Sequence, residues 1–468
     1  MNEPRHTTVD VCAECHECRG DRCAPARGAL RNYGGIRFTS DGFDCALPVS
    51  IDSHSHCSYG CLYCFSDNLM SHREGTTAPV GQTNLKHIER VFAGEGGRQA
   101  ALLRKALRYG TGTYPCPVQV GALNDPCDHI ERQQGWLLKF IELAIKYRQP
   151  VRISTKGTVL SLPEYQRALS KAPELFWVAF SIITSDDDLL QRIDRRAPNA
   201  TERLQTMADL SRIGVRTSLR LRPMLAGVTD ATYEDLIEKA SRAGVYAISY
   251  ETAFYPGMPP AGVRWRWEEL SRIAGVPYKK VYGQFGRMQA CTRPSFLWTE
   301  NIMHAVHDKA KECGLVVGVS DPVWKQLGET GCCCGMLPGD PVFGNWQPEG
   351  ATNMLLQARD TGRLVGPRDV TPPWAYDVLT VQLVDGGAGP LVRYKCRHET
   401  WADKIRQVWN GLDRQRGPLV YFQGAMMPHH QSEEGDWFFE YKGLKRQHAG
   451  QPYWKLPRDT TTSQGEQP

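Results

Sequence analysis

Three cysteines in one short stretch, Cys57, Cys61 and Cys64, have the type and spacing of ligands for a soft metal centre. Their C-x3-C-x2-C spacing lets one tight loop gather three thiolates. A [4Fe-4S] cube has four irons, so three thiolates leave one iron open to a substrate or cofactor. The alternatives are a zinc site with His54 or His56 as fourth ligand, or a buried cluster of reduced cysteines. Zinc sites favour two separated C-x2-C pairs, so the spacing favours the iron-sulfur cluster.

Tyr63 precedes and Phe65 follows the last of these cysteines, and with this ending the loop resembles the signature of the radical S-adenosylmethionine (SAM) superfamily. The resemblance implies that the amino and carboxylate groups of SAM chelate the open iron. It also implies reductive cleavage of SAM to a 5′-deoxyadenosyl radical, a reductant such as flavodoxin or ferredoxin, and a place for Tyr63 and Phe65 in the cofactor site.

A second cysteine run near the N-terminus consists of Cys12, Cys15, Cys18 and Cys23. Its C-x2-C-x2-C-x4-C spacing resembles the ligand run of bacterial ferredoxins with one residue added. Four thiolates so close in sequence can enclose a second Fe-S cluster or, with His16 as an alternative ligand, one zinc ion. The role follows the metal, because a cluster can relay electrons whereas zinc would only fold the segment.

A third group is the consecutive run Cys332, Cys333 and Cys334, which is bounded by glycines. Regular structure cannot point all three side chains at one centre, so a tight turn is needed if more than one is to act. Exposed consecutive thiols oxidise readily, which favours a functional, catalytic role over a simple thiol patch. Two roles fit: ligands of an auxiliary cluster together with Cys291 or Cys313, or a thiol that donates a hydrogen atom to a product radical.

The composition is that of a soluble globular chain. With 468 residues, 41% hydrophobic and 23% charged, the sequence is long enough for two or three domains. No window approaches ~18 uninterrupted apolar residues, and the N-terminus has no apolar core of a signal peptide. We therefore expect a cytoplasmic protein with no membrane contact, whose 16 cysteines are metal ligands and thiols. The net charge of +5 permits an anionic partner without requiring one.

Short apolar, β-rich runs alternate with helical patterns from about residue 48 to 325, which predicts βαβ units and a parallel sheet. The expected strands are 46–51, 118–123, 151–155, 177–183, 215–221, 246–251 and 315–319. The expected helices are 133–147, 162–172, 201–212, 233–243 and 299–313. The fold class is thus α/β, and six strand-helix repeats match the partial (β/α)6 barrel of the radical SAM fold, with functional residues at the C-terminal strand ends.

The predicted organisation has five parts. They are a Cys-rich metal-binding segment (1–47), the barrel (48–325), a Cys/Gly-rich auxiliary segment (326–366), a small α+β domain (367–457) and a disordered tail (458–468). In the fourth part we expect a hairpin at 378–394, a helix at 400–412 and strands at 419–422 and 437–441. Trp401 and Trp409 lie there among basic residues and can stack on nucleic-acid bases, although such residues more often form a solvated surface.

Within the superfamily, the motifs over about residues 50–227 resemble the spore photoproduct lyase-like, or DNA-repair photolyase-like, group. Residues 121–126 resemble its Gly-x-x-x-Asp-Pro strand end, and Thr155 and Lys156 its third-strand Thr-Lys. Residues 181–184 resemble its Ser-Ile-Thr-Thr, and 193–198, which read Ile-Asp-Arg-Arg-Ala-Pro, its Glu-Pro-Arg-Ala-Pro. Residues 222–227 stand where the group's fifth strand ends in a proline-rich turn.

Each motif has a physical task if SAM lies across the strand ends. Lys156 can pair with the carboxylate of SAM, and Ser181 can hydrogen-bond the same end. Asn124 and Asp125 can bind the ribose hydroxyls, and Arg222 completes the predicted cofactor site. An ordinary strand-end pair is the alternative for Lys156 and Ser181, and a turn cap is the alternative for Asp125.

One departure bears on the reaction. Spore photoproduct lyase itself carries, on its second strand, a cysteine that returns a hydrogen atom to the thymine radical. Ala122 stands there in this chain, and the nearest thiols are Cys116 and Cys127, which argues against dimer repair.

The resemblance implies a lyase- or isomerase-type enzyme that abstracts hydrogen from a nucleic-acid base or nucleotide-linked group, modifying, rearranging or repairing a thymine-type base. DNA or a nucleotide is the expected partner. A polar barrel interior with Arg220, Arg222, Glu251 and Tyr250 would suit a polar or anionic substrate. The alternatives are a peptide- or protein-modifying radical SAM enzyme, whose C-x9–15-G-x4-C pattern is absent, and a non-catalytic zinc-binding nucleic-acid module.

Overall fold

The structure is a computed structural model that describes residues 31–39, 43–66, 80–110, 112–256, 261–279, 287–288, 291–292, 296–380, 399–412 and 417–446. The N-terminal run Cys12, Cys15, Cys18 and Cys23, most of the expected hairpin at 378–394 and the expected tail at 458–468 lie outside these residues. Within the described residues, no helix is long and apolar enough to cross a membrane.

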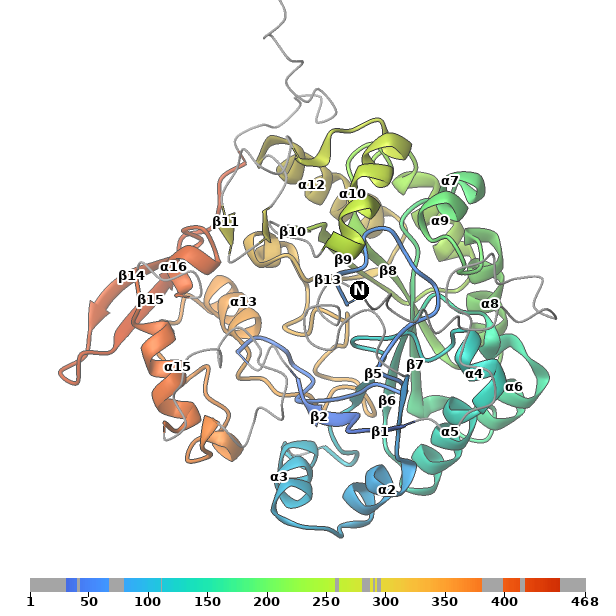
Figure 1. The fold of residues 1–468 in the computed structure, drawn as a ribbon. Helices are drawn as coiled ribbons and strands as arrows, with labels where there is room; N and C mark the ends of the chain where they lie inside the picture. Colours follow the sequence, from blue (N-terminus) through green and yellow to red (C-terminus); the bar gives the residue numbers. More distant parts are fainter. Residues whose placement is uncertain are drawn as a thin grey trace, which may run out of the picture.

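A largely parallel sheet organises the chain, and Figure 1 shows it at the centre of the molecule. Its strand order is β13-β9-β8-β7-β6-β5-β3-β2, and β2 alone runs antiparallel to its neighbour in this sheet. The strands are β2 (Ile36–Phe38), β3 (Val49–Ile51), β5 (Val118–Val120), β6 (Val151–Thr155), β7 (Phe176–Ser181), β8 (Arg216–Met224), β9 (Ala247–Thr252) and β13 (Val316–Val319). The expected α/β fold with a parallel sheet is confirmed.

Helices connect these strands, and Figure 1 shows α4 to α9 along one side of the sheet. They are α2 (Leu85–Ala93), α3 (Arg98–Leu107), α4 (His129–Gln134), α5 (Trp136–Lys146), α6 (Pro163–Leu169), α7 (Asp187–Ile193), α8 (Ala200–Arg212), α9 (Tyr233–Arg242), α10 (Ala261–Ala274) and α12 (Phe296–Glu312). Short 3-10 turns lie at η1 (Val159–Ser161), η2 (Pro173–Leu175) and η3 (Pro322–Leu327). All five expected barrel helices are confirmed, and the first is split at Gly135 into α4 and α5.

Local sequence explains where these helices begin. Asn199 caps α8 by accepting the Glu202 backbone N–H, and Glu202 bonds back to the Asn199 backbone, which is a capping box. Asp128 caps α4 in the same position by accepting the backbone N–H of Ile130. Helix α5 buries Trp136 and Phe140 one turn apart, so its apolar face packs on the sheet.

Alternation along the strands gives the sheet one apolar and one polar face. In β8, Leu219 and Leu221 are fully buried, while Arg220 and Arg222 project from the opposite face. Arg152 in β6 lies on the polar face, since its Nη1 donates to Ser154 Oγ at 2.7 Å two residues along the strand. The barrel interior is therefore lined by polar side chains, as the sequence predicts for Arg220, Arg222 and Glu251.

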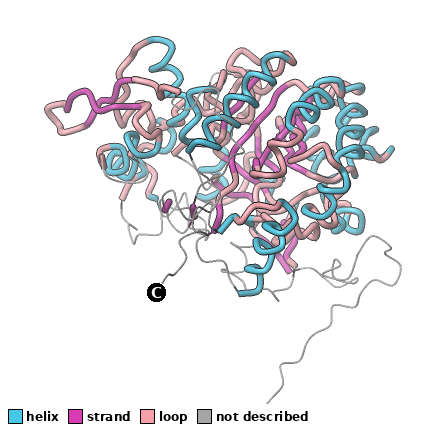
Figure 2. The backbone as a smooth tube through the Cα atoms, turned by 90° about the horizontal axis from the view of Figure 1, so that it is seen from above, coloured by secondary structure: helices cyan, strands magenta, loops and turns pink. Residues whose placement is uncertain are grey.

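The C-terminal elements pack on the other side of the molecule. They are α13 (Ala351–Thr361), η4 (Pro373–Ala375), α15 (Trp401–Trp409), α16 (Pro418–Tyr421) and a hairpin of β14 (Met426–Gln431) and β15 (Trp437–Tyr441). Figure 2 shows the hairpin projecting from the rest of the chain. Three further pairings are short: β1 (Arg31–Tyr33) with β4 (Gly81–Thr83), and β12 (Cys291–Thr292) with both β10 (Tyr255–Pro256) and β11 (Arg287–Met288).

Two predictions for this region are wrong. The expected strand at 419–422 is the short helix α16, which begins at Pro418, a residue well suited to the first turn of a helix. Trp401 and Trp409 are 5% and 0% exposed, so neither can stack on a nucleic-acid base. Trp409 instead packs against Phe43 and Phe439, which joins the C-terminal helices to the chain before β3.

A buried ion pair links these distant parts. The Asp44 carboxylate accepts from Lys325 Nζ, from Tyr421 Oη at 2.7 Å and from the Thr352 backbone N–H at 2.7 Å. Burial opposes ionisation of Asp44, but Lys325 outweighs it and lowers the carboxyl pKa below 3.8. Because the folded pKa is lowered, the carboxylate stabilises the fold above pH 3.8 and this stabilisation is lost as the pH falls further.

We predict that Asp44→Asn lowers the free energy of unfolding by about 3–5 kcal/mol, because it removes the buried carboxylate that balances the charge of the Lys325 ammonium. Denaturant unfolding followed by tryptophan fluorescence measures the change. The control is Glu89→Gln, which breaks an exposed pair with Lys146 and should leave the midpoint nearly unchanged. Equal midpoints for the two variants would contradict the role assigned to Asp44.

Candidate active site

Cys57, Cys61 and Cys64 lie on the loop that follows β3, at the carboxyl end of that strand. We call this loop the cysteine loop. Cys61 is buried, and Cys57 and Cys64 are half-buried. Burial, followed by the charges of Asp128, Asp125 and Cys61, raises the pKa of Cys57. Burial also raises the pKa of Cys61, which interacts electrostatically with Cys64. Cys61 therefore lies within electrostatic range of both Cys57 and Cys64.

A glycine makes this loop possible. Gly60 has a φ of 64°, in the left-handed region that side chains disfavour. A Cβ atom at this position would come within 2.8 Å of Nη2 of Arg196. Any other residue would strain the turn that brings Cys57 and Cys61 together.

The donor set fits an iron-sulfur cube better than a single zinc ion. Within the described residues, no group of three or more Cys, His, Asp or Glu side chains could hold one metal ion. A cube does not require such convergence, because each thiolate binds a different iron. In His54, the alternative zinc ligand, Nδ1 lies 3.0 Å from Ser53 Oγ and Nε2 lies 3.2 Å from Gln82 Nε2. His56 has its Nδ1 2.8 Å from Ser55 Oγ.

The first half of the loop is anchored to the segment after β5. Asp128 Oδ2 accepts the Ser58 backbone N–H at 2.8 Å and the Ser58 hydroxyl at 3.0 Å. The Tyr59 hydroxyl donates to the Cys127 carbonyl at 2.8 Å. Since Asp128 also caps α4, the loop is fixed to the start of that helix.

The second half of the loop is anchored to Asp194, at the end of α7. The Tyr63 hydroxyl donates to Asp194 Oδ1 at 2.6 Å, and Lys156 Nζ donates to the Tyr63 oxygen at 2.8 Å. Arg203 Nη1 lies 2.8 Å and Lys156 Nζ 3.7 Å from Asp194 Oδ2. Burial opposes ionisation of Asp194, yet Lys156 and Arg203 together lower its pKa. The sequence motifs assigned no role to Asp194 or Arg203.

Three of the predicted cofactor residues, Asn124, Ser181 and Phe65, lie on or near the loop. Asn124 Nδ2 donates to Ser53 Oγ at 2.7 Å, just before the cysteines. Ser181 is buried at the end of β7, and its carbonyl accepts from Arg203 at 2.6 Å. Phe65 is 63% exposed at the end of the loop. For Arg222, the described contact is an ion pair with Glu251 on the neighbouring strand β9.

Asp125 joins the ends of two strands. Its Oδ1 accepts from the Thr155 hydroxyl at 2.6 Å and from the Cys127 backbone N–H at 3.0 Å. Its Oδ2 accepts the Lys156 backbone N–H at 2.6 Å. Burial raises the pKa of Asp125, and these hydrogen bonds oppose the rise. This geometry favours the turn-cap alternative, in which Asp125 positions Lys156.

The barrel interior contains Arg152, Arg220, Arg222 and Glu251. Register places Arg220 between Ser181 of β7 and Ser249 of β9. The prediction that Tyr250 lines this interior is wrong, because Tyr250 faces the opposite side of β9. It is fully buried there, and its pKa is raised first by burial and then by Asp308, Glu329 and Asp321.

The triple-cysteine turn enters the same interior. A Cβ on Gly318 of β13 would come within 2.4 Å of the Cys333 carbonyl, so the turn lies against the inner face of that strand. Interaction with Cys334, followed by burial, raises the pKa of Cys333, and interaction with Cys332 raises the pKa of Cys334 to about 11. Arg222 is electrostatically coupled to both Cys333 and Cys334.

The other candidate thiols lie elsewhere. Cys313 follows α12, where its carbonyl accepts from Ser241 of α9, and the groups that influence its pKa come from these two helices. This position does not favour an auxiliary cluster that joins Cys313 to the triple-cysteine turn. Cys116 precedes β5, at the opposite strand end from the cysteine loop, and Cys127 is buried behind Tyr59. The side chain of Cys291 is outside the described residues.

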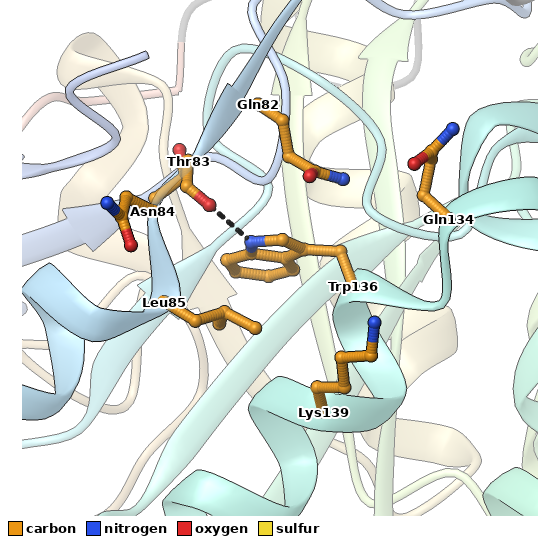
Figure 3. A pocket seen from close by; sticks show the side chains of 7 residues that line it. All are labelled: Gln82, Thr83, Asn84, Leu85, Gln134, Trp136 and Lys139. Atoms are coloured by element: carbon orange, nitrogen blue, oxygen red, sulfur yellow. Dashed lines mark hydrogen bonds between the residues drawn. The ribbon is translucent and has the colours of Figure 1, made fainter. Parts of the chain in front are cut away.

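A separate pocket of about 300 Å³ lies beside β4 and the start of α2 (Figure 3). Its lining is Gln82, Thr83, Asn84, Leu85, Gln134, Trp136 and Lys139. The Trp136 indole N–H donates to the Thr83 carbonyl at 2.8 Å at the edge of this pocket. The lining contains no cysteine or carboxylate, so it offers no ligand for an iron-sulfur cluster.

Comparison with known proteins found a matching family model and similar solved structures. A family model described as Radical SAM superfamily matches residues 53–240, which span the cysteine loop and the strand ends. A cysteine-to-serine variant of spore photoproduct lyase is similar, with a TM-score of 0.44 and 14% identity over 64% of this chain and 84% of that one. Spore photoproduct lyase complexed with dinucleoside spore photoproduct is also similar, with a TM-score of 0.44 and 13% identity over 62% of this chain and 83% of that one.

The Streptococcus suis protein SuiB bound to precursor peptide SuiA gives a TM-score of 0.37 and 11% identity, over 58% of this chain and 48% of that one. No curated protein matches the chain. Structural likenesses at this distance do not identify a substrate.

We predict that Cys61→Ala abolishes the iron and sulfide bound at this loop, because two thiolates no longer hold three corners of a cube. Iron and sulfide analysis after anaerobic reconstitution measures the loss, with the N-terminal run left intact in every variant. Cys313→Ala is the matched control, since its thiol lies on the helical side of the sheet. Equal loss of iron and sulfide in the control, or none in Cys61→Ala, would contradict the assignment.

Proposed function

The chain belongs to the radical SAM superfamily, and on that premise we propose that it abstracts a hydrogen atom from a nucleic-acid base or nucleotide-linked substrate. One observation carries the proposal: the cysteine loop lies at the carboxyl ends of parallel strands, and the barrel interior that these strands enclose is lined by guanidinium groups. The family implies a [4Fe-4S] cluster and SAM, which when bound supply the 5′-deoxyadenosyl radical.

Cys57, Cys61 and Cys64 would hold the cluster. Lys156 would bind the carboxylate of SAM, because its ammonium is already directed toward the loop by the Tyr63 hydroxyl and by Asp194. Asn124 and Ser181 would add hydrogen bonds, and the exposed ring of Phe65 would offer an apolar contact. Asp125 would act as a positioning residue for Lys156.

The charge of the interior supports a nucleotide-type substrate. Among the described side chains, the barrel interior contains three guanidinium groups, those of Arg152, Arg220 and Arg222. The carboxylate described beside them is that of Glu251. A peptide substrate would need no such excess of positive charge, whereas phosphate-bearing groups are bound preferentially by arginine. Modification or rearrangement of a thymine-type base is the reaction that we favour within this class.

The triple-cysteine turn would return a hydrogen atom to the product. Raised pKa values keep Cys333 and Cys334 as thiols at neutral pH, so an S–H bond is present. Transfer would break that S–H bond and form a C–H bond on the substrate radical, which leaves a sulfur-centred radical. One electron from a flavodoxin- or ferredoxin-type reductant and one proton would restore the thiol.

We predict that the anaerobically reconstituted protein forms 5′-deoxyadenosine from SAM when dithionite is added. Cys61→Ala should form none, and Lys156→Met should raise the SAM concentration for half-maximal rate about tenfold, because one charge-assisted contact is lost. Chromatographic assay of 5′-deoxyadenosine measures both effects, with Cys313→Ala as control. A wild-type protein fully loaded with iron and sulfide that forms no 5′-deoxyadenosine would refute the proposed function.

We further predict that the thiol of the turn is the source of the returned hydrogen. In deuterated water the wild-type product should gain deuterium, because thiol hydrogens exchange with solvent. Cys333→Ala or Cys334→Ala should remove that label or stall turnover, whereas Cys313→Ala should not. Mass spectrometry of products formed with mononucleotides or oligonucleotides measures the label, and full labelling in both turn variants would rule out the role.

A further inference from the structure

Three arginines converge on the barrel interior from two strands. Arg152 lies on β6, and Arg220 and Arg222 lie two residues apart on β8, so strand alternation directs all three to the same face. Figure 1 shows β6, β7 and β8 side by side. Glu251 of β9 forms an ion pair with Arg222. We call these three arginines and Glu251 the arginine cluster.

The cluster contains hydrogen-bonding groups that the described protein leaves unused. Arg152 donates through Nη1 to Gln119 and Ser154, but its Nε is buried without a partner. Arg220 Nε is also buried without a partner. The hydroxyl of Ser249, which pairs in register with Arg220, has no partner either. Buried donors of this kind are costly unless something binds them.

The charges in the cluster are also unbalanced. Three guanidinium groups face one carboxylate, and both sulfur neighbours, Cys333 and Cys334, remain neutral thiols. Burial, followed by repulsion from Arg222 and Arg152, lowers the pKa of Arg220 to about 9. Arg220 is still charged at neutral pH, and an anion placed beside it would relieve this repulsion.

A purely structural role does not account for this arrangement. Arg222 pairs with Glu251, whereas among the described side chains Arg220 forms no ion pair, although Glu251 also acts on it electrostatically. Holding the partly buried Arg220 guanidinium without an ion-pair partner opposes folding, and an apolar residue would pack there at lower cost. The arrangement instead resembles the preorganised clamps that bind oxyanions through several guanidinium groups.

We propose that the arginine cluster binds a phosphate group of the substrate inside the barrel. The excess of two positive charges among the described side chains matches a dianionic phosphate monoester better than a phosphodiester or a carboxylate. This inference rests on the proposed function and narrows it, because a monoester points to a free nucleotide rather than to a base within a DNA strand. Glu251 then acts as a positioning residue that orients Arg222.

Equilibrium binding tests the inference without turnover. The protein reconstituted with its cluster and SAM, without reductant, is titrated calorimetrically with thymidine 5′-monophosphate, with thymidine and with the dinucleotide thymidylyl-thymidine. We expect the monophosphate to bind at least about tenfold more tightly than either of the others. Arg220→Gln should remove most of this advantage, and Arg220→Lys should restore part of it because the charge returns.

Arg212→Gln is the matched control, since Arg212 pairs with Asp209 on the exposed face of α8. Iron content and thermal unfolding show whether each variant is folded and loaded. Equal affinities for thymidine and its monophosphate, or an unchanged phosphate advantage in folded Arg220→Gln, would overturn the inference. A phosphodiester preferred over the monoester would also overturn it, and would assign the cluster to a DNA strand. Absence of 5′-deoxyadenosine formation would refute the proposed function alone, since phosphate binding is measured separately.

Discussion

The buried carboxylate of Asp194 is the contact on which the candidate site depends. It accepts from Tyr63 on the cysteine loop and from Arg203 on α8, and it lies close to the ammonium of Lys156. One carboxylate beside the buried Arg203 and the partly buried Lys156 leaves a positive excess, so Lys156 can share its charge with a ligand while Arg203 keeps Asp194 ionised. Removal of Asp194 would leave the buried Arg203 without its carboxylate, and would remove the anchor of the second half of the loop.

Alternation along parallel strands connects this loop to the barrel interior. The residues that face the helices form the apolar core, so those between them must face inward, and most of these are polar in β6, β8 and β9. The carboxyl ends of the same strands carry Asn124, Asp125, Lys156 and Ser181 near the cysteine loop. A substrate held by the interior would therefore lie along the same strands that position the cofactor residues.

The sequence predicted the parts of this site that depend on local pattern. Cysteine spacing located the loop, and apolar periodicity located the barrel strands and five of the helices. It could not assign Asp194 or Arg203, because their partners are distant in sequence and only the fold brings them together. The prediction for Tyr250 was wrong because neighbouring residues of a strand face opposite sides of the sheet. The strand expected at 419–422 was wrong because a short apolar run does not distinguish a strand from a helix.

The position of the triple-cysteine turn bears on its chemistry. The turn lies against the inner face of β13, where a Cβ on Gly318 would come within 2.4 Å of the Cys333 carbonyl. Arg222 interacts electrostatically with both Cys333 and Cys334 there. Cys313, one of the two further cysteines considered as a ligand beside the turn, lies by α9 and α12. The place of the turn inside the barrel, away from Cys313, is therefore the feature that supports the proposed hydrogen-atom donation to a bound substrate.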